Sequence, residues 1–384
     1  MDTARFSSQQ QKQLVKTPEG AWAFVPGPLP PKLDLAKLAL PLATAAVAIG
    51  ELKGAARRLQ NPYMLIDPLQ RREALTSSAM EGTITTLGDM VLEEAGDDSP
   101  KGDDAREALN YVRAIEASIK MLEQLPISHR VIKEAHALLL RGLSPARGAG
   151  KKHGQYKTSQ NAVGKRGETI HTARYVPPPP QQTQKCMDEL EAFINSEHQN
   201  PVEKLINLAL VHYQFEAIHP FDDGNGRIGR MLITLMAQHS GLLDLPILHV
   251  SAYLERNKDE YIDRLFAVSS SAQWEDWIVF FFSAVEASCR EATMIVDRII
   301  LLQSDLKKRA QEAGKSPRSL IIIDALFRKT WTTATEVQKL CNISFPTAQS
   351  DLKNLAKIGI LREMPGRTSR LYYAPEILAL SDRS

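Results

Sequence analysis

Residues 219–230, HPFDDGNGRIGR, combine side chains and a turn that suit the chemistry of a polyphosphate. An imidazole has an ordinary pKa of about 6.5 and can accept a proton near neutral pH. A carboxylate can hold a divalent cation. A Gly-Asn-Gly turn at the start of a helix can present backbone amides to an anion, and two arginines one turn apart can hold terminal phosphates. The stretch therefore predicts a phosphate-handling site with a base beside it. The residues with these roles are His219, Asp223, Gly224, Asn225, Gly226, Arg227 and Arg230.

The composition of the 384-residue chain is that of an ordinary globular protein, with 43% hydrophobic and 24% charged residues. The length allows two or three domains, and the net charge of +2 gives the whole chain no nucleic-acid or membrane signature. Three scattered cysteines without metal-binding spacing predict reduced thiols in a cytoplasmic protein. No apolar stretch is expected to reach the roughly 20 residues that span a bilayer, and the polar N-terminus does not resemble a signal peptide.

Helical periodicity dominates the chain on both sides of the central stretch. Residues 1–17 predict a mobile polar leader, and the proline-rich residues 21–31 predict an extended strap across the main domain rather than a ligand for a proline-binding module. Elsewhere apolar residues recur at spacings of three and four, which is typical of amphipathic helices. These helices are expected over 34–59, within 68–95, and over 105–125, 127–143, 184–196, 202–218 and 227–240, with at least two more in 251–314.

Residues 150–180 differ in kind, because they are basic and glycine-rich and end in four consecutive prolines. Two short runs of β-forming residues flank Gly164 and Gly167, which predicts an exposed β-hairpin over residues 154–175. A two-stranded hairpin with free edges can accept an extended peptide as a third strand. This hairpin is therefore a candidate docking site for a protein partner.

From residue 315 onward the pattern changes to two helices, a turn, a further helix and a short hairpin at Pro365-Gly366. This order predicts a winged helix-turn-helix domain. Residues 315–384 contain eleven Lys and Arg against six Asp and Glu, so positive charge is concentrated there. The expected domains are 1–104, a strap and helical region; 105–314, the core that holds the central stretch; and 315–384, the winged helix.

A carboxylate stands at the end of a predicted helix in the N-terminal region. Glu81 directly precedes Gly82, and glycine commonly follows the last turn of a helix. The C-terminal end of a helix already carries partial negative charge, so a carboxylate placed there needs a compensating cation. Considered alone, Glu81 is more simply interpreted as a solvated surface residue.

The central stretch resembles the signature of the Fic (filamentation induced by cAMP) family, H-x-F-x-(D/E)-G-N-G-R-x-x-R, at every specified position. The segment SSAMEGT is similar to the inhibitory motif (S/T)-x-x-x-E-(G/N) of that family, through Ser77, Glu81 and Gly82. The strap, the hairpin before VPPPP and the winged helix also resemble one bacterial architecture of the family, so the resemblance covers nearly the whole chain. It implies a mainly α fold: a Fic-type helical bundle with a β-hairpin flap, plus a C-terminal winged helix-turn-helix domain.

The resemblance implies a protein adenylyltransferase that moves AMP from ATP to a Ser, Thr or Tyr hydroxyl of a target protein or of itself, and releases pyrophosphate. His219 would be the base, Asp223 would hold Mg²⁺, and an inhibitory helix at about 68–82 would place Glu81 on Arg230. Relatives often have N-x-x-x-YY after the signature, whereas here Ile262 replaces the second tyrosine, which leaves the shape of the nucleobase pocket open. The residues implied to bind ATP are Gly224, Asn225, Gly226, Arg227, Ile228, Gly229, Arg230, Asn257 and Tyr261.

Several alternatives stay open at this stage. The chain could be a DNA-binding transcriptional regulator with a secondary Fic domain, a bifunctional enzyme that also removes AMP, or a transferase of another group such as UMP or phosphocholine. For the winged helix, protein docking or self-association is the favoured interpretation over DNA binding. The expected partner is a protein docked as a strand on the hairpin; self-modification and a homo-oligomer are left open, and no membrane partner is expected.

Overall fold

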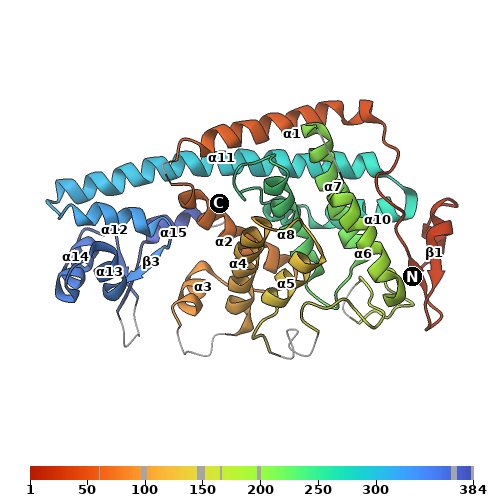
Figure 1. Cartoon of the computed structure of the whole chain (residues 1–384), viewed down its shortest axis with the longest axis horizontal. Coiled ribbons are helices and arrows are strands. Elements are labelled where there is room, and N and C mark those ends of the chain that lie inside the picture. The colour runs from red at the N-terminus through yellow and green to blue at the C-terminus, as the bar shows by residue number, and fades with distance from the viewer. Residues whose placement is uncertain are drawn as a thin grey trace.

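The computed structural model describes residues 1–59, 61–96, 102–144, 152–164, 167–196, 200–364 and 370–381, and they are mainly helical, as predicted. Two long helices, α1 (Leu35–Ala56) and α11 (Trp274–Glu312), lie side by side along one edge of the molecule (Figure 1). They run in the same direction, because the Asp34 N–H donates to Glu275 at one end and Arg58 pairs with Asp297 further along. From this edge α11 continues into the C-terminal unit.

Helix α1 corrects one expectation drawn from the sequence. It has 22 residues and includes an 18-residue window with a mean hydropathy of 1.6, so by length and composition alone it could cross a membrane, a test that core helices of soluble proteins also pass. In the fold it packs along α11, with Leu38 and Leu52 fully buried. Leu40 and Val47 on its other side are exposed. The structure therefore uses α1 as a packed helix of the bundle.

The central bundle surrounds the stretch of sequence that carries the predicted chemistry. Helix α4 packs against α2 and α5, α7 packs against α8 and α6, and α2 also packs on α9 and α11. The helices between α1 and α11 are α2 (Tyr63–Met80), α3 (Leu87–Glu94), α4 (Asp103–Leu122), α5 (His129–Leu139), α6 (Pro180–Ile194), α7 (Pro201–Ile218), α8 (Asn225–His239), α9 (Ser251–Arg256) and α10 (Lys258–Ser271).

The prediction of a mobile leader over residues 1–17 is wrong. This segment forms two 3₁₀ turns, η1 (Thr3–Arg5) and η2 (Gln10–Gln13), and a strand β1 (Leu14–Lys16) that pairs antiparallel with β2 (Trp22–Phe24). Phe6 explains the difference, because its buried ring lies 5.7 Å from the rings of both Phe24 and Phe266. Met1 is buried as well, and the Ser7 N–H donates to Ser270 O at 2.8 Å, so both side chains and backbone anchor this segment to the bundle.

The hairpin expected over residues 154–175 is much shorter than predicted. In the described part of this segment the only strand pairing is one antiparallel bridge between Val163 and Tyr175, and the predicted turn includes residues 165–166, which lie outside the described part. The preceding residues bond to the loop after α7 instead, as when the Lys157 N–H donates to Pro220 O at 2.8 Å. Contacts with that loop thus replace the expected strand ladder.

The C-terminal unit contains the three predicted helices and two hairpin strands in the predicted order, and it adds a strand, β3, after the first of these helices and a short helix, α15, after the hairpin. Its three short strands form an antiparallel sheet in the order β3-β5-β4. The tip of the predicted hairpin falls on residues 365–369, outside the described part, and the winged-helix assignment stays a prediction. The elements are α12 (Arg318–Leu326), β3 (Trp331–Thr333), α13 (Ala334–Cys341), α14 (Phe345–Lys357), β4 (Arg362–Glu363), β5 (Leu371–Tyr373), α15 (Pro375–Leu378) and η4 (Ala379–Ser381).

The packing of α1 can be tested with two leucines of the same helix. Leu52→Ala is expected to lower the free energy of unfolding by about 2–5 kcal/mol, because it empties a fully buried site. The control Leu40→Ala alters a side chain that is 78% exposed and should change stability by no more than about 0.5 kcal/mol. Urea unfolding in detergent-free buffer measures both. Equal, small effects would contradict the packing of α1 on the bundle.

Candidate active site

The predicted base lies at the junction of two buried helices. Helix α7 ends at His219, which adopts the left-handed conformation with φ 48° and ψ 60°. That conformation is unfavourable for a non-glycine residue, so the surrounding contacts must hold it. Gly224 has φ 77° at the start of α8, where a Cβ would lie only 3.2 Å from Leu139. The turn between the two helices therefore depends on a glycine at position 224.

Asn225 and a histidine of α5 hold this loop from two sides. The Asn225 amide accepts from Phe221 N–H and donates to Phe221 O, both at 2.8 Å. The buried ring of Phe221 stacks on His136, with 3.8 Å between ring centroids. Since His136 Nδ1 accepts from the Gly154 N–H, its Nε2 carries the proton and donates to Asp223 O at 3.0 Å. Burial lowers the pKa of His136 to about 4, so this support is neutral at pH 7.

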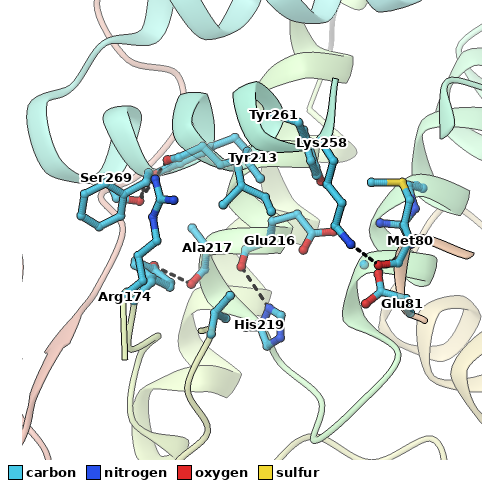
Figure 2. A pocket seen from close by; sticks show the side chains of 17 residues that line it. Met80, Glu81, Arg174, Tyr213, Glu216, Ala217, His219, Lys258, Tyr261 and Ser269 are labelled. Carbon is cyan, nitrogen blue, oxygen red and sulfur yellow. Dashed lines mark hydrogen bonds and ion pairs between the residues drawn. The ribbon is translucent and has the colours of Figure 1, made fainter. Parts of the chain in front are cut away.

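The ring of His219 has a defined tautomer. Its Nδ1 lies 3.3 Å from Glu216 O, and because a carbonyl can only accept, Nδ1 carries the proton (Figure 2). Nε2 is then the nitrogen with a lone pair. Burial, followed by the charge of Lys157, lowers the pKa of His219 to about 4. The imidazole is therefore neutral at physiological pH and able to accept a proton, as expected of a base.

Arg230 is the best-satisfied cation of the site. It is 2% exposed, its Nε donates to Ser77 Oγ at 2.8 Å, and one terminal nitrogen donates to Ser77 O at 2.9 Å and to Glu81 Oε1 at 2.8 Å. Helix α2 ends at Met80, and Gly82 follows Glu81 in the left-handed conformation expected of a helix C-cap. The structure thus supplies Glu81 with the compensating cation that its position at a helix end required.

Glu81 also lies over the beginning of α8. A Cβ added at Gly226 would collide with Glu81 Oε1, so the carboxylate lies directly against the first turn of that helix. Burial alone would raise the pKa of Glu81, but Arg230, with Arg227 and His219, outweighs burial and lowers it. Glu81 is consequently an anion held at a helix N-terminus, the position that an anionic ligand would favour.

Arg227 and Asp223 are placed differently from Arg230. The Arg227 guanidinium is buried in an ion pair with Glu107 of α4 and lies 3.5 Å from Asp223 Oδ1. It does not line the cavity beside His219, and its role as a phosphate ligand stays a prediction. Asp223 Oδ1 accepts from the Gly224 N–H, and its side chain is 38% exposed.

The described residues contain no group of three or more His, Cys, Asp or Glu that could hold a metal ion by themselves. Magnesium usually takes only one or two protein carboxylates and completes its coordination with water and substrate phosphates. Asp223, whose side chain is partly exposed beside the start of α8, is compatible with that mode of binding. The donor set therefore fits Mg²⁺ brought in with a polyphosphate rather than a resident metal.

A cavity of about 240 Å³ begins at this cluster (Figure 2). Gly226 and Arg230 line one part of it, and Phe266 and Ser269 line another. Tyr261, predicted to contact the nucleoside, forms part of its wall. The cavity thus joins the candidate anion site to a more apolar compartment, as an elongated ligand with one charged end requires.

Two residues next to each other at the start of α10 differ from expectation. The Asn257 amide donates to Tyr253 O at 2.9 Å and does not line the cavity. Its neighbour Lys258 lines the cavity instead, and its Nζ donates to Met80 O at 2.6 Å, which ties α10 to the end of α2 (Figure 2). No sequence pattern pointed to Lys258, because an exposed lysine at the start of a helix has no distinctive spacing.

Glu216 is a further residue that sequence reasoning missed. It lies on α7, three residues before His219, and lines the cavity beside Arg230. Burial raises the pKa of Glu216 to about 7, against the opposing effect of Arg230, and its Oε1 has no hydrogen-bond partner among the described residues. A Cβ on Gly229 would collide with this carboxylate, which explains the glycine at that position. Ile228, between the two glycines of α8, points into the core.

Comparison with known proteins identifies the same region of the chain. The family models described as "Fic/DOC family N-terminal" and "Fic/DOC family" match residues 40–120 and 126–237. The protein adenylyltransferase Fic of Drosophila virilis is 30% identical over 134 residues, which cover 35% of this chain and 24% of that protein. The Drosophila melanogaster protein of the same name is 28% identical over 134 residues, covering 35% and 23% respectively. The match thus spans about a quarter of the length of these curated relatives.

Among solved structures, the chain is similar to a Fic family protein from Desulfovibrio desulfuricans G20. The TM-score is 0.56 and the sequence identity 21%, with 90% of this chain and 98% of that chain covered. At this level of identity the similarity shows a shared fold.

The close approach of Glu216 to α8 can be tested with two helical glycines. Gly229→Ala is expected to destabilise the protein by about 1–3 kcal/mol, because the new Cβ overlaps the Glu216 carboxylate. The control Gly50→Ala places a methyl in open space on α1 and should stabilise by about 0.5–1 kcal/mol through helix propensity. Thermal unfolding followed by circular dichroism shows whether each substitution raises or lowers the stability of the protein. A stabilising effect at position 229 would rule out the close contact.

Proposed function

Because this chain belongs to the Fic/DOC family, we propose that it is a protein adenylyltransferase that moves AMP from ATP to a Ser, Thr or Tyr hydroxyl of a protein. The observation that carries the proposal is the arrangement around one cavity of a neutral imidazole, a helix N-terminus and a buried arginine. His219 supplies the base, the start of α8 supplies an anion site, and Arg230 supplies a fixed positive charge. These are the groups that phosphoryl-type transfer requires, since it depends mainly on positioning and electrostatic stabilisation.

In the proposed reaction, the target hydroxyl oxygen forms a bond to the α-phosphorus of ATP while the bond from that phosphorus to the leaving diphosphate breaks. The hydroxyl proton passes to Nε2 of His219, because Nδ1 is already protonated toward Glu216 O. Negative charge that grows on the α-phosphate lies at the first turn of α8, where backbone N–H groups and the helix dipole stabilise it. Mg²⁺, held through Asp223 and the substrate phosphates, would neutralise charge on the leaving group.

The same contacts explain how the reaction would be restrained. Arg230 is the natural ligand for the terminal phosphate, but its Nε and one terminal nitrogen already donate to Ser77 and Glu81. The Glu81 carboxylate also lies on the first turn of α8, where a phosphate would bind. ATP would therefore have to displace Glu81 or bind with its α-phosphorus out of line. We infer that α2 is an inhibitory helix and that its movement away from α8 starts catalysis.

The protein target is expected to approach along residues 154–175. Val163 and Tyr175 form the bridge in this segment, and Ala162 and Gly164, on either side of Val163, are exposed. Tyr175 and Val163 both line the cavity that contains His219. A strand that pairs with this segment would bring a hydroxyl to the cavity, with register supplied by the backbone. Binding of a further partner, including DNA, by residues 315–384 remains a separate prediction.

Removal of the inhibitory carboxylate is the direct test of the proposed reaction. Glu81→Gly is expected to increase self-modification with ATP and Mg²⁺ strongly, because it frees Arg230. His219→Ala in the same background should lower the rate by about 10²–10⁴-fold through loss of the base. Intact-mass and peptide mass spectrometry would reveal a gain of one AMP on a Ser, Thr or Tyr. The proposed reaction would be refuted if Glu81→Gly formed no AMP adduct, either on itself or on proteins of a cell lysate. The inhibitory role of Glu81 would be refuted if wild type and Glu81→Gly were labelled to the same low level.

Two adjacent serines provide a finer test of inhibition. Ser77→Ala removes the Oγ that accepts from Arg230 Nε, whereas Ser78 Oγ has no hydrogen-bond partner among the described residues. A hydrogen bond to a charged group contributes about 1.5–3 kcal/mol, so Ser77→Ala should raise the labelling rate by about ten- to a hundredfold. Ser78→Ala is the matched control and should leave the rate unchanged. The same increase from both variants would show that general loosening of α2, not the bond to Arg230, is responsible.

A further inference from the structure

Four successive carbonyls of the loop that carries His219 accept hydrogen bonds from one short segment, residues 157–161. The Lys157 N–H donates to Pro220 O at 2.8 Å, and Lys157 Nζ donates to Ile218 O at 3.2 Å. The Asn161 amide nitrogen donates to the two remaining carbonyls, those of residues 219 and 221, at 3.1 and 2.9 Å. Lys157 Nζ also donates to Asn161 Oδ1 at 2.8 Å, so the two side chains form a connected unit. We refer to Lys157 and Asn161 as the loop cradle.

The cradle places a cation where burial makes a cation unfavourable. Lys157 is 3% exposed, and burial lowers the pKa of its ammonium group to about 7. A residue that only filled space here would be more stable as an apolar side chain of the same length, because a buried charge is costly even when it is hydrogen-bonded. The presence of an ammonium group therefore calls for an explanation beyond packing.

We propose that the loop cradle positions the base: Lys157 and Asn161 hold His219 in its left-handed conformation, and the ammonium group of Lys157 adds to burial in disfavouring the protonated imidazole. This inference deepens the proposed adenylyl transfer and rests on it. Both are positioning residues, since their donors bond to loop carbonyls and to each other. Asn161 of the cradle lies two residues before Val163, which forms the β-bridge. The segment that is expected to bind the target protein therefore also holds the loop of His219.

The sign of the electrostatic effect follows from the groups around the imidazole. Burial and Lys157 both disfavour the protonated imidazole. Three other groups favour it: Glu81 after α2, Asp223 from the loop and the Glu216 carbonyl from α7. Burial disfavours the charged form of Lys157, Asp222 favours it, and Cys186 on α6 faces it as a neutral thiol, because burial raises the pKa of Cys186 to about 11. Because His219 titrates near pH 4, below the pKa of Lys157, the ammonium group is charged throughout that titration. Its removal must therefore raise the pKa of His219.

The first experiment compares two lysines of the same segment in the Glu81→Gly background. Lys157→Met keeps the length of the buried side chain but removes its charge and donors; Lys152→Met removes an exposed lysine five residues earlier. Lys157→Met is expected to lower the rate at saturating ATP by about tenfold or more, because a misplaced base loses much of its contribution, with the KM for ATP essentially unchanged. The acid limb of its pH–rate profile should move to higher pH. Lys152→Met should behave as the parent, and a parent-like rate and profile for Lys157→Met would overturn the proposal.

A second measurement does not depend on activity. The His219 ring, assigned by comparison with His219→Ala, is titrated by NMR in the parent, Lys157→Met and Lys152→Met proteins. A higher midpoint in Lys157→Met alone supports the cradle, and an unchanged midpoint overturns it. If the parent Glu81→Gly protein shows no adenylyl transfer, the proposed function fails while this titration still reports on the cradle.

If Lys157→Met does not fold by circular dichroism, Asn161→Ser provides the test instead. It removes the two amide donors to residues 219 and 221 but retains Lys157. The rate at saturating ATP should fall while the KM for ATP stays the same, and an unchanged rate would overturn the proposal.

Discussion

The burial of Arg230 is the constraint on which the site depends. A guanidinium is charged at every accessible pH, so at 2% exposure it needs anionic and carbonyl partners to offset the loss of water. Helix α2 and the residue that follows it supply these partners, through Ser77 and Glu81. A triphosphate could provide the same compensation. In the proposed reaction, the resting protein and the substrate-bound protein would therefore satisfy one electrostatic requirement in two different ways, and Arg230 would be both a binding residue and the point of inhibition.

The position of Glu81 in turn depends on what holds α2. Arg71 pairs with Asp67 and Glu94, and Glu94 also accepts from the indole N–H of Trp331 in the C-terminal unit. Near its other end, the helix is tied to α10 where Lys258 donates to Met80 O. Because most side chains of α2 are buried, small shifts of this helix cannot be absorbed locally. The helix that ends at Glu81 is thus in contact with the bundle, with α10 and with the C-terminal unit at once.

The sequence predicted the parts of the site that have a periodic or motif signature. The α7–α8 turn, its base and the need of Glu81 for a cation all follow from residue types and spacing. The sequence did not separate Arg227 from Arg230: both lie one turn apart on α8, yet one pairs with Glu107 and the other with Glu81, and only the neighbouring helices decide which. His136 and Glu216 were missed because a single polar residue within a helical pattern shows no partner, and Lys157 was missed because it is one of several lysines in a basic segment. The leader was mispredicted because its few apolar residues and its backbone contacts with the bundle outweighed its polar composition.

Depth of burial assigns the charge states within the site. Burial lowers the pKa of His136 to about 4 and of His212, which holds Tyr261 from α7, to about 3; it raises that of Glu216 to about 7. Each of these groups is driven toward its neutral form by the same loss of hydration. Glu81 differs, because its side chain is 39% exposed and paired with Arg230, which lowers the pKa of Glu81 and so favours its ionised form. Glu81, the anion that would exchange with phosphate in the proposed reaction, therefore lies at the accessible edge of the site, whereas the groups driven toward their neutral forms are less exposed.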